Sequence, residues 1–136
     1  MPVVAIDFGT RRVGVAVSTS GILATPHAVI PNEGDVERVI ERIVAIGEEI
    51  EAELYVVGLP RRTRSGSADP ALAPYRDLAE RLRQRTRKEV VLWDEAYSTA
   101  EASSRARERG RRPTSIDMEA AAVILQAYLD ERGGTR

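Results

Sequence analysis

Three acidic residues stand at positions where a carboxylate is suited to chemistry. Asp7 interrupts the apolar run VVAIDF, Glu95 comes just after the apolar run at residues 90–93, and Asp117 falls in the first turn of a predicted final helix. An ionised carboxylate in an apolar setting is costly unless it is paired or bound to a metal. The pattern therefore raises the hypothesis that Asp7 holds a cation.

Carboxylates from three separate segments would form a site of hard oxygen ligands, which suits Mg²⁺ or Mn²⁺ rather than zinc. If the strands of Asp7 and Glu95 are neighbours in a sheet, these two acids meet near one sheet edge, and the helix start adds Asp117. Two divalent ions about 3.5–4 Å apart would contact both the attacking and the leaving oxygen in phosphoryl hydrolysis. The sequence thus motivates a metal-dependent hydrolytic site.

Each acid also has an ordinary structural interpretation. Asp7 could accept a hydrogen bond in a tight turn, Glu95 could be a surface acid at a strand end, and Asp117 could simply suit the helix dipole. Asp94 competes with Glu95, because neighbouring residues on a strand point to opposite faces. The apolar surroundings favour a functional role for Asp7, whereas the pattern alone favours the dipole interpretation for Asp117.

Apolar periodicity predicts an α/β fold with a mixed central sheet and flanking helices. Val-rich runs at 3–8 and 13–18, joined by Gly-Thr-Arg-Arg, indicate an antiparallel hairpin, and later strands that alternate with helices indicate a partly parallel sheet. Pro26 places a third strand at a sheet edge or breaks it. The other expected elements are that strand at 22–30, an amphipathic helix at 36–50, a strand at 54–58, a loop at 59–70, a helix through 72–82, a strand at 90–93, a helix opened by a capping box of Ser98 and Glu101, a basic segment at 105–112 stopped by Pro113, and a last helix from about 115 to 131.

The charges are unevenly distributed, although the formal net charge is −1. Residues 33–53 contain eight acids and two bases, whereas residues 61–112 contain fourteen bases and eight acids. Thirteen of those bases are arginines, whose planar guanidinium fits phosphate in a bidentate manner. A solvated surface is the plainer interpretation for any single arginine, but the clusters favour a nucleic-acid backbone. The candidate nucleic-acid-binding residues are Arg11, Arg12, Arg61, Arg62, Arg64, Arg105, Arg109, Arg111 and Arg112.

Composition excludes several classes of protein. The chain has no cysteine, which rules out disulfides and thiolate metal sites. Its one histidine, His27, argues against a histidine-based triad or zinc site. We find no run of about 18 apolar residues, no secretory signal and no Walker-type phosphate loop. We therefore expect residues 1–136 to form one cytoplasmic domain with no membrane partner.

Three stretches together resemble one known family. AIDFGTRRVGVAVS, YVVGLP with a following glycine-containing loop, and VLWDEAYSTAEA with the later IDMEAAAVILQAYLD are similar in order and spacing to the YqgF (RuvX) family. The resemblance covers nearly the whole chain. That family is similar in fold to ribonuclease H and to the RuvC Holliday-junction resolvases. Its members are regarded as nucleases associated with maturation of the 16S rRNA 5′ end and, in some accounts, with branched DNA.

The resemblance implies that Asp7, Glu95 and Asp117 are the catalytic and metal-binding carboxylates, and it selects Glu95 over Asp94. It implies Mg²⁺ or Mn²⁺ as the cofactor. It further implies RNA, in the form of pre-16S rRNA, or branched DNA as the substrate, acted on by a monomer or a homodimer.

The chain departs from the family pattern at two positions, Thr19, where an acid is common, and Ala96, where arginine is common. These changes concern substrate preference and rate more than the site itself.

Two other function classes fit parts of the sequence. Asp-Phe-Gly-Thr before an apolar strand also resembles the phosphate-binding hairpin of sugar kinases and actin-type ATPases, which need a second lobe. A non-catalytic nucleic-acid-binding module is the other alternative, and the presence of all three acids argues against it.

Overall fold

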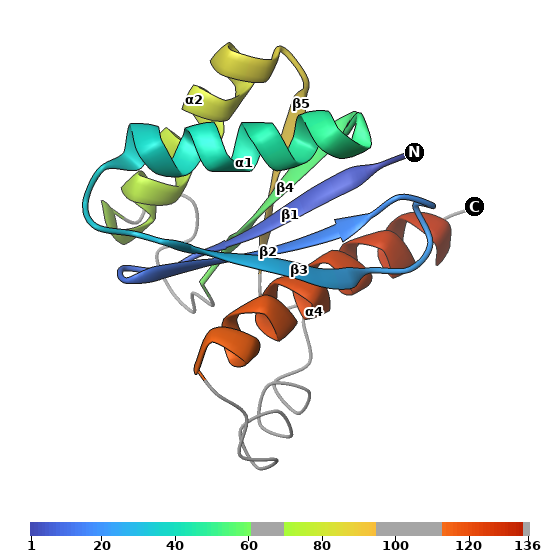
Figure 1. The fold of residues 1–136 in the computed structure, drawn as a ribbon. Helices are drawn as coiled ribbons and strands as arrows, with labels where there is room; N and C mark the ends of the chain where they lie inside the picture. The colour runs from blue at the N-terminus through green and yellow to red at the C-terminus, as the bar shows by residue number, and fades with distance from the viewer. Residues whose placement is uncertain (61–69, 95–112, 135–136) are drawn as a thin grey trace.

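A five-stranded mixed sheet forms the centre of the molecule (Figure 1). The computed structural model describes residues 1–60, 70–94 and 113–134, and in the last range the side chains of 117–132. The sheet order is β3-β2-β1-β4-β5. The pairs β3–β2 and β2–β1 are antiparallel, and the pairs β1–β4 and β4–β5 are parallel. The strands are β1 (Val3–Phe8), β2 (Arg12–Ser18), β3 (Thr25–Pro31), β4 (Leu54–Leu59) and β5 (Glu89–Asp94).

The edge strand β3 begins later than the sequence predicted. Ile22 and Leu23 are exposed rather than paired, because the Ser20 hydroxyl accepts hydrogen bonds from both of their amides and closes a turn there. Pro26 lies in this edge strand as expected, next to a shift of register between Val15 and Ala16 on β2. A proline at an edge removes a donor that no inner strand needs.

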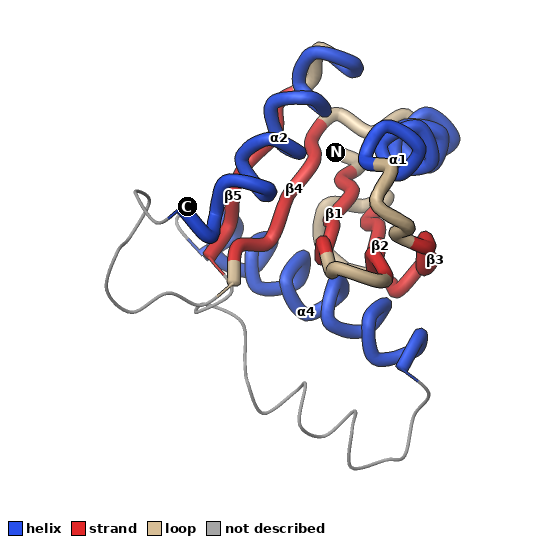
Figure 2. The backbone as a smooth tube through the Cα atoms, turned by 90° about the vertical axis from the view of Figure 1, so that its left-hand side faces the viewer, coloured by secondary structure: helices blue, strands red, loops and turns tan. Residues whose placement is uncertain are grey.

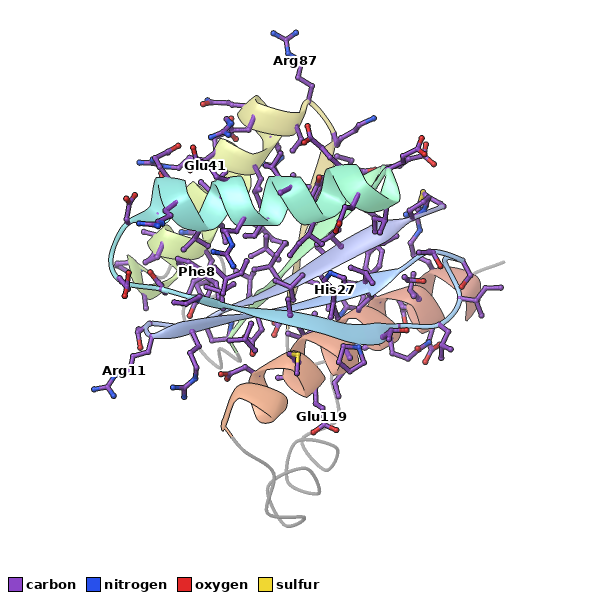
Figure 3. All side chains as sticks on the ribbon, in the orientation of Figure 1. Phe8, Arg11, His27, Glu41, Arg87 and Glu119 are labelled. Carbon is purple, nitrogen blue, oxygen red and sulfur yellow. The ribbon has the colours of Figure 1, made fainter. Side chains whose placement is uncertain are left out.

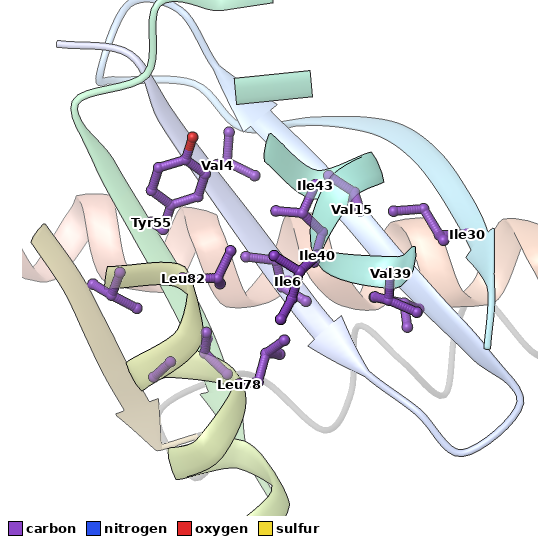
Figure 4. Packing of buried hydrophobic residues seen from close by; sticks show 14 of the residues in the cluster. Val4, Ile6, Val15, Ile30, Val39, Ile40, Ile43, Tyr55, Leu78 and Leu82 are labelled. Carbon is purple, nitrogen blue, oxygen red and sulfur yellow. The ribbon is translucent and has the colours of Figure 1, made fainter. Parts of the chain in front are cut away.

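Two helices cover one face of the sheet. The helix α1 (Val36–Ile50) has the Asp35 side chain as its N-cap, which accepts a hydrogen bond from the Arg38 amide. A short turn, η2 (Pro70–Leu72), leads into α2 (Ala73–Thr86). Their apolar stripes pack on alternate residues of the strands to form the larger core cluster (Figure 4). Its central members include Val4, Ile6, Val15, Ile40, Ile43, Leu78 and Leu82.

Among the described elements, the helix α4 (Pro113–Gly134) covers the opposite face (Figure 2). Its buried residues pack on the other set of strand residues, among them Val3, Ala5 and Val56. Trp93 of β5 and Tyr128 of α4 meet edge to face, with ring centroids 5.2 Å apart. Both faces of the inner strands are therefore buried, which explains why they are apolar runs without alternation.

The start of α4 corrects the sequence interpretation. The helix begins at Pro113, not near 115, because a proline in the first turn loses no hydrogen bond that the helix needs. Asp117 therefore lies beyond the first turn, which contains no acid, and the dipole interpretation of that residue loses its basis. The predicted capping-box helix and the basic segment at 105–112 lie outside the described residues. Among the described helices, none is long and apolar enough to cross a bilayer.

Candidate active site

Asp7 lies near the carboxyl end of β1 and on the face that α4 covers. Strand alternation puts it on the side of Val3 and Ala5, which pack in the α4 cluster. Phe8, the next residue, points to the other face and meets Tyr75 edge to face at 5.9 Å. The one acid of this strand therefore points toward the helix that carries Asp117.

Gly14 brings α4 directly onto the strand beside Asp7. In the β1–β2 ladder Gly14 is the partner of Asp7. A Cβ atom on Gly14 would lie 2.1 Å from the backbone carbonyl oxygen of Asp117, so only glycine allows this approach. The sequence analysis did not single out Gly14, although a glycine inside a Val-rich strand is a signal for close backbone contact.

Arg12 holds the Asp117 carboxylate from the side. Its Nε donates a hydrogen bond of 2.7 Å to Asp117 Oδ2, and the two side chains are 41% and 25% exposed. Arg12 opens β2 and has the same strand parity as Gly14. Strand β2 therefore contacts Asp117 twice, through the Gly14 backbone and through the Arg12 guanidinium.

The turn after Asp7 is held by a second residue that the sequence analysis missed. The Gly9 amide donates to the Arg12 carbonyl at 3.1 Å, and a Cβ on Gly9 would lie 2.4 Å from that oxygen. Asn32 donates from Nδ2 to the Gly9 carbonyl at 2.7 Å and from its amide to the Arg11 carbonyl at 2.8 Å. Asn32 therefore fixes the loop between Asp7 and Arg12.

The two aspartates share one electrostatic environment. Burial, and then the nearby charge of Asp117, raise the pKa of Asp7 from 3.8 to about 6. Among the described residues, the guanidinium that bonds to this pair of acids is that of Arg12, and its bond is to Asp117. Such an arrangement has room for further positive charge.

The site fits a hard divalent cation in part. Asp7 and Asp117 supply the oxygen ligands that Mg²⁺ and Mn²⁺ prefer. No group of three potential ligands occurs within the described ranges, and Glu95, the third predicted ligand, lies outside them. Where the sequence argument supposed β1 and β5 to be neighbours, β4 lies between them. These three strands are parallel, however, so their carboxyl ends still lie at the same end of the sheet.

Strand parity bears on the choice between Asp94 and Glu95. Trp93 packs in the α4 cluster, whereas Leu92 packs in the cluster on the other face. Asp94 has the parity of Leu92 and so belongs to the face away from Asp7.

The two arginines predicted to bind nucleic acid lie in different surroundings. Arg11 is exposed and extends away from the body of the protein (Figure 3), whereas Arg12 is bonded to Asp117. The other predicted nucleic-acid-binding residues lie outside the described ranges, namely Arg61, Arg62, Arg64, Arg105, Arg109, Arg111 and Arg112.

The acidic helix α1 packs on the face of the sheet opposite to α4. Its Glu37 forms ion pairs with Arg81 and with Arg85 of α2. A hollow of about 730 Å³ on this side is lined by Gly47, Tyr55 and Arg85 among others, and it does not include Asp7 or Asp117. His27, in the edge strand β3, is exposed (Figure 3).

Comparison with known proteins gives matches over most of the chain. A family model described as "RuvX: Holliday junction resolvase" matches residues 1–131. A Mycobacterium protein (strain KMS) is 39% identical over 135 residues, which are 95% of this chain and 79% of that protein. A Nitratidesulfovibrio vulgaris protein is 36% identical over 135 residues, 96% and 94% of the two chains. Both relatives carry the name "putative pre-16S rRNA nuclease".

The fold itself is similar to that of a solved resolvase. The structure of T. thermophilus RuvC in complex with a Holliday junction substrate superposes with a TM-score of 0.64, covering 99% of this chain and 97% of that one. At 18% identity this is a likeness of fold alone. It confirms the predicted ribonuclease H-like architecture.

Proposed function

The chain belongs to the RuvX (YqgF) family, and from this premise we propose that it is a metal-dependent nuclease that hydrolyses nucleic-acid phosphodiester bonds. We propose residues 1–136 as one nuclease domain that works in the cytoplasm. The catalytic residues in this proposal are Asp7, Asp117 and Glu95.

One observation carries the proposal: Asp7 and Asp117 come together from strand and helix, 110 positions apart in the sequence, on a surface built to hold them. The charge of Asp117 contributes to the raised pKa of Asp7, which supports their proximity. Ordinary surface acids avoid such contact, because like charges at short range destabilise the folded state. Two carboxylates held near each other at the carboxyl end of β1 indicate a binding site for a cation.

Asp7 and Asp117 would hold Mg²⁺ or Mn²⁺, with Glu95 as the third carboxylate. When bound, the metal would lower the pKa of a water molecule and neutralise charge on the phosphate in the transition state. The protein's own contribution is orientation. Gly14 fixes the helix backbone at Asp117, Arg12 fixes its carboxylate, and the turn held by Asn32 fixes the strand that carries Asp7.

RNA is the substrate that we rank first. Relatives at 36–43% identity carry the rRNA nuclease name, whereas the likeness to RuvC is one of fold. We propose that exposed arginines such as Arg11 contact the phosphate backbone and that specificity comes from backbone shape and end geometry. Branched DNA is the alternative, since the family description names a Holliday junction resolvase. Symmetric cleavage of a junction would need a two-fold dimer.

The test compares wild type with Asp7→Asn and with a matched control, Glu41→Gln, which changes an exposed acid on the far face. Each protein is offered a single-stranded RNA, a precursor-like RNA and a four-way DNA junction, with Mg²⁺ or Mn²⁺. We expect Asp7→Asn to lose at least about 10²-fold in cleavage, the scale on which a main electrostatic partner of a transition state acts. Binding and fold should persist, and Glu41→Gln should cleave like wild type.

The other outcomes separate the alternatives. Cleavage by Asp7→Asn at the wild-type rate would rule out this site as the catalytic centre. Symmetric incision of the junction by a dimer, with RNA left intact, would establish the resolvase alternative. Nucleic-acid binding that EDTA leaves unchanged, without cleavage under either metal, would favour a non-catalytic binding module.

A further inference from the structure

Arg11 and Arg12 are adjacent in sequence but differ in what their side chains do. We propose that Arg12 is a positioning residue that sets the direction of the Asp117 carboxylate, while Arg11 is the arginine that meets the substrate phosphate. This inference rests on the nuclease function proposed above. It divides between two neighbours a role that the sequence pattern gave to both.

The first argument is the double contact between β2 and Asp117. The backbone carbonyl oxygen of Asp117 lies 2.1 Å from the position that a Gly14 Cβ would take. This contact sets the distance between the helix α4 and the strand β2. With the backbone fixed, the carboxylate can still rotate about its side-chain bonds. The 2.7 Å hydrogen bond from Arg12 Nε to Oδ2 removes that freedom.

The second argument is which atoms the pair uses. Among the described residues, the hydrogen bond to the Asp117 carboxylate goes to Oδ2, so Oδ1 is left for a cation. A carboxylate that is itself hydrogen-bonded is the usual arrangement around a metal, and loss of such a partner typically costs about 10–100-fold in metal affinity or activity. The Arg12–Asp117 pair has this form.

The third argument is charge. Asp7 is the ladder partner of Gly14, and Gly14 lies against the backbone of Asp117, so the two acids come from adjoining positions. A cation beside them lowers their mutual repulsion, and Arg12 supplies it through a direct bond. An arginine used in this way is not free to travel with a phosphate, because leaving Asp117 would restore the repulsion.

Among the described residues, the bond to Asp117 belongs to Arg12 and not to Arg11. Arg11 is exposed at the tip of the β1–β2 turn and points outward (Figure 3). Its backbone is held, since its carbonyl accepts the Asn32 amide at 2.8 Å. A fixed backbone with an outward guanidinium is suited to contact a phosphate near the site.

The first experiment measures binding without catalysis. A fluorescent single-stranded RNA is titrated with wild type, Arg11→Ala, Arg12→Ala and the control Arg42→Ala, in EDTA, over a range of salt. Each phosphate contact on a single strand contributes about 0.7 to the log–log salt slope. We expect Arg11→Ala to reduce the slope by about that amount, and Arg12→Ala and Arg42→Ala to leave it unchanged.

The second experiment separates kcat from KM with Mg²⁺ or Mn²⁺ present. We expect Arg12→Ala to lower kcat by about 10–100-fold, as loss of a hydrogen-bond partner of a metal ligand does, with KM nearly unchanged. Arg12→Lys should not restore kcat, because an ammonium lacks the rigid planar fork of arginine. Arg11→Ala should raise KM and keep most of kcat.

A third measurement keeps the inference testable if wild type proves not to cleave RNA or DNA, a result that would count against the nuclease proposal alone. Unfolding midpoints are compared for Arg12→Ala, Asp117→Ala and the double variant. We expect the Arg12→Ala effect to vanish once Asp117 is gone, because the two act as one unit. Fully additive midpoints, or a salt slope that Arg12→Ala lowers as much as Arg11→Ala, would overturn the positioning role.

Discussion

Two glycines make close contacts on opposite faces of the sheet. On the α4 face, Gly14 of β2 contacts the backbone of α4, and on the α1 face, Gly47 of α1 contacts the Tyr55 side chain. A Cβ on Gly14 would lie 2.1 Å from the Asp117 carbonyl oxygen, and a Cβ on Gly47 would lie 1.9 Å from the Tyr55 hydroxyl. The two clashes are alike in distance and different in kind. A backbone carbonyl inside a helix cannot move alone, whereas the far end of a tyrosine can.

The difference follows what each face has to do. The α1 and α2 face is an apolar core, where small shifts of side chains cost little once volume is conserved. The α4 face holds Asp7 and Asp117, whose mutual position decides whether they can share a cation. The contact at the site joins two backbones, whereas the contact away from it can adapt. The rigid contact is therefore the one that sets the positions of Asp7 and Asp117.

The largest effect should come from Gly14→Ala. The added methyl must push α4 off β2 at Asp117, because the atom it meets is backbone. We expect a loss of about 3 kcal/mol in the free energy of unfolding, at the upper end of overpacking costs, together with loss of cleavage. Urea unfolding and the RNA cleavage assay check this.

A result near wild type for Gly14→Ala would break the comparison, because it would mean that α4 can move from the strand without harm. Ala16→Gly, on the same strand and face, is the control. It should lose some stability through backbone entropy, about 0.5–1 kcal/mol or more, and keep the Asp117 contact.

The next effect is a gain, and it comes from Asp7→Asn. Asp7 has a pKa of about 6 in the folded protein against 3.8 ordinarily, so its ionised form opposes folding. The cost is fully present above about pH 6 and disappears as the pH falls below 3.8. Without metal, Asp7→Asn should therefore be more stable than wild type at pH 8, by about 2 kcal/mol after allowing for partial exposure.

Urea unfolding in EDTA between pH 4 and pH 8 measures this difference, with Glu41→Gln as the control. The gap between Asp7→Asn and wild type should widen as the pH rises through that window and then level off. A constant gap would show that the carboxyl of Asp7 is not perturbed. Addition of Mn²⁺ should reverse the order, because the metal stabilises the protein that binds it.

Much of this site could be predicted from the sequence, and the remainder could not for definite reasons. Asp7 stood out because it was an acid in an apolar strand, and its ribonuclease H-like surroundings followed from the family resemblance. The start of the last helix was placed two residues too late, which put Asp117 in its first turn, because Pro113 was taken as a stop and not as a helix start. Gly14 and Asn32 act through contacts with segments distant in sequence. A glycine in a Val-rich strand signals a close approach, but no local pattern says which segment approaches.

A smaller effect is expected for Gly47→Ala on the other face. Alanine favours the helix by about 1 kcal/mol, but its methyl meets the Tyr55 ring end, so we expect a net loss of about 1 kcal/mol. Cleavage should not change. Tyr55→Phe added to Gly47→Ala should recover part of the loss by removing the hydroxyl, while the ring carbon Cζ, 2.7 Å from the new atom, keeps some of it.

Chemical unfolding of the two single variants and the double variant gives the test. If the double variant were no more stable than Gly47→Ala, the hydroxyl would not be the obstacle. If Gly47→Ala reduced cleavage as much as Gly14→Ala, both faces would be equally coupled to the site, and the contrast between them would fail.

The smallest effect sharpens the comparison within α4 itself. Gln126 accepts from the Ala24 amide at 2.9 Å and donates to the Ile22 carbonyl at 2.9 Å and to Asp130 at 3.0 Å, so it holds the β2–β3 loop on the helix. Because it lies nine residues beyond Asp117, about 13 Å along the axis, it should serve stability alone. We expect Gln126→Ala to cost about 0.5 kcal/mol, the lower end for hydrogen bonds that water can replace, and to leave kcat, KM and Mn²⁺ binding as in wild type. Asp130→Ala, which removes only the exposed partner, should cost less. A fall in kcat for Gln126→Ala would mean that the whole length of α4, and not its contact at Gly14, positions the carboxylates.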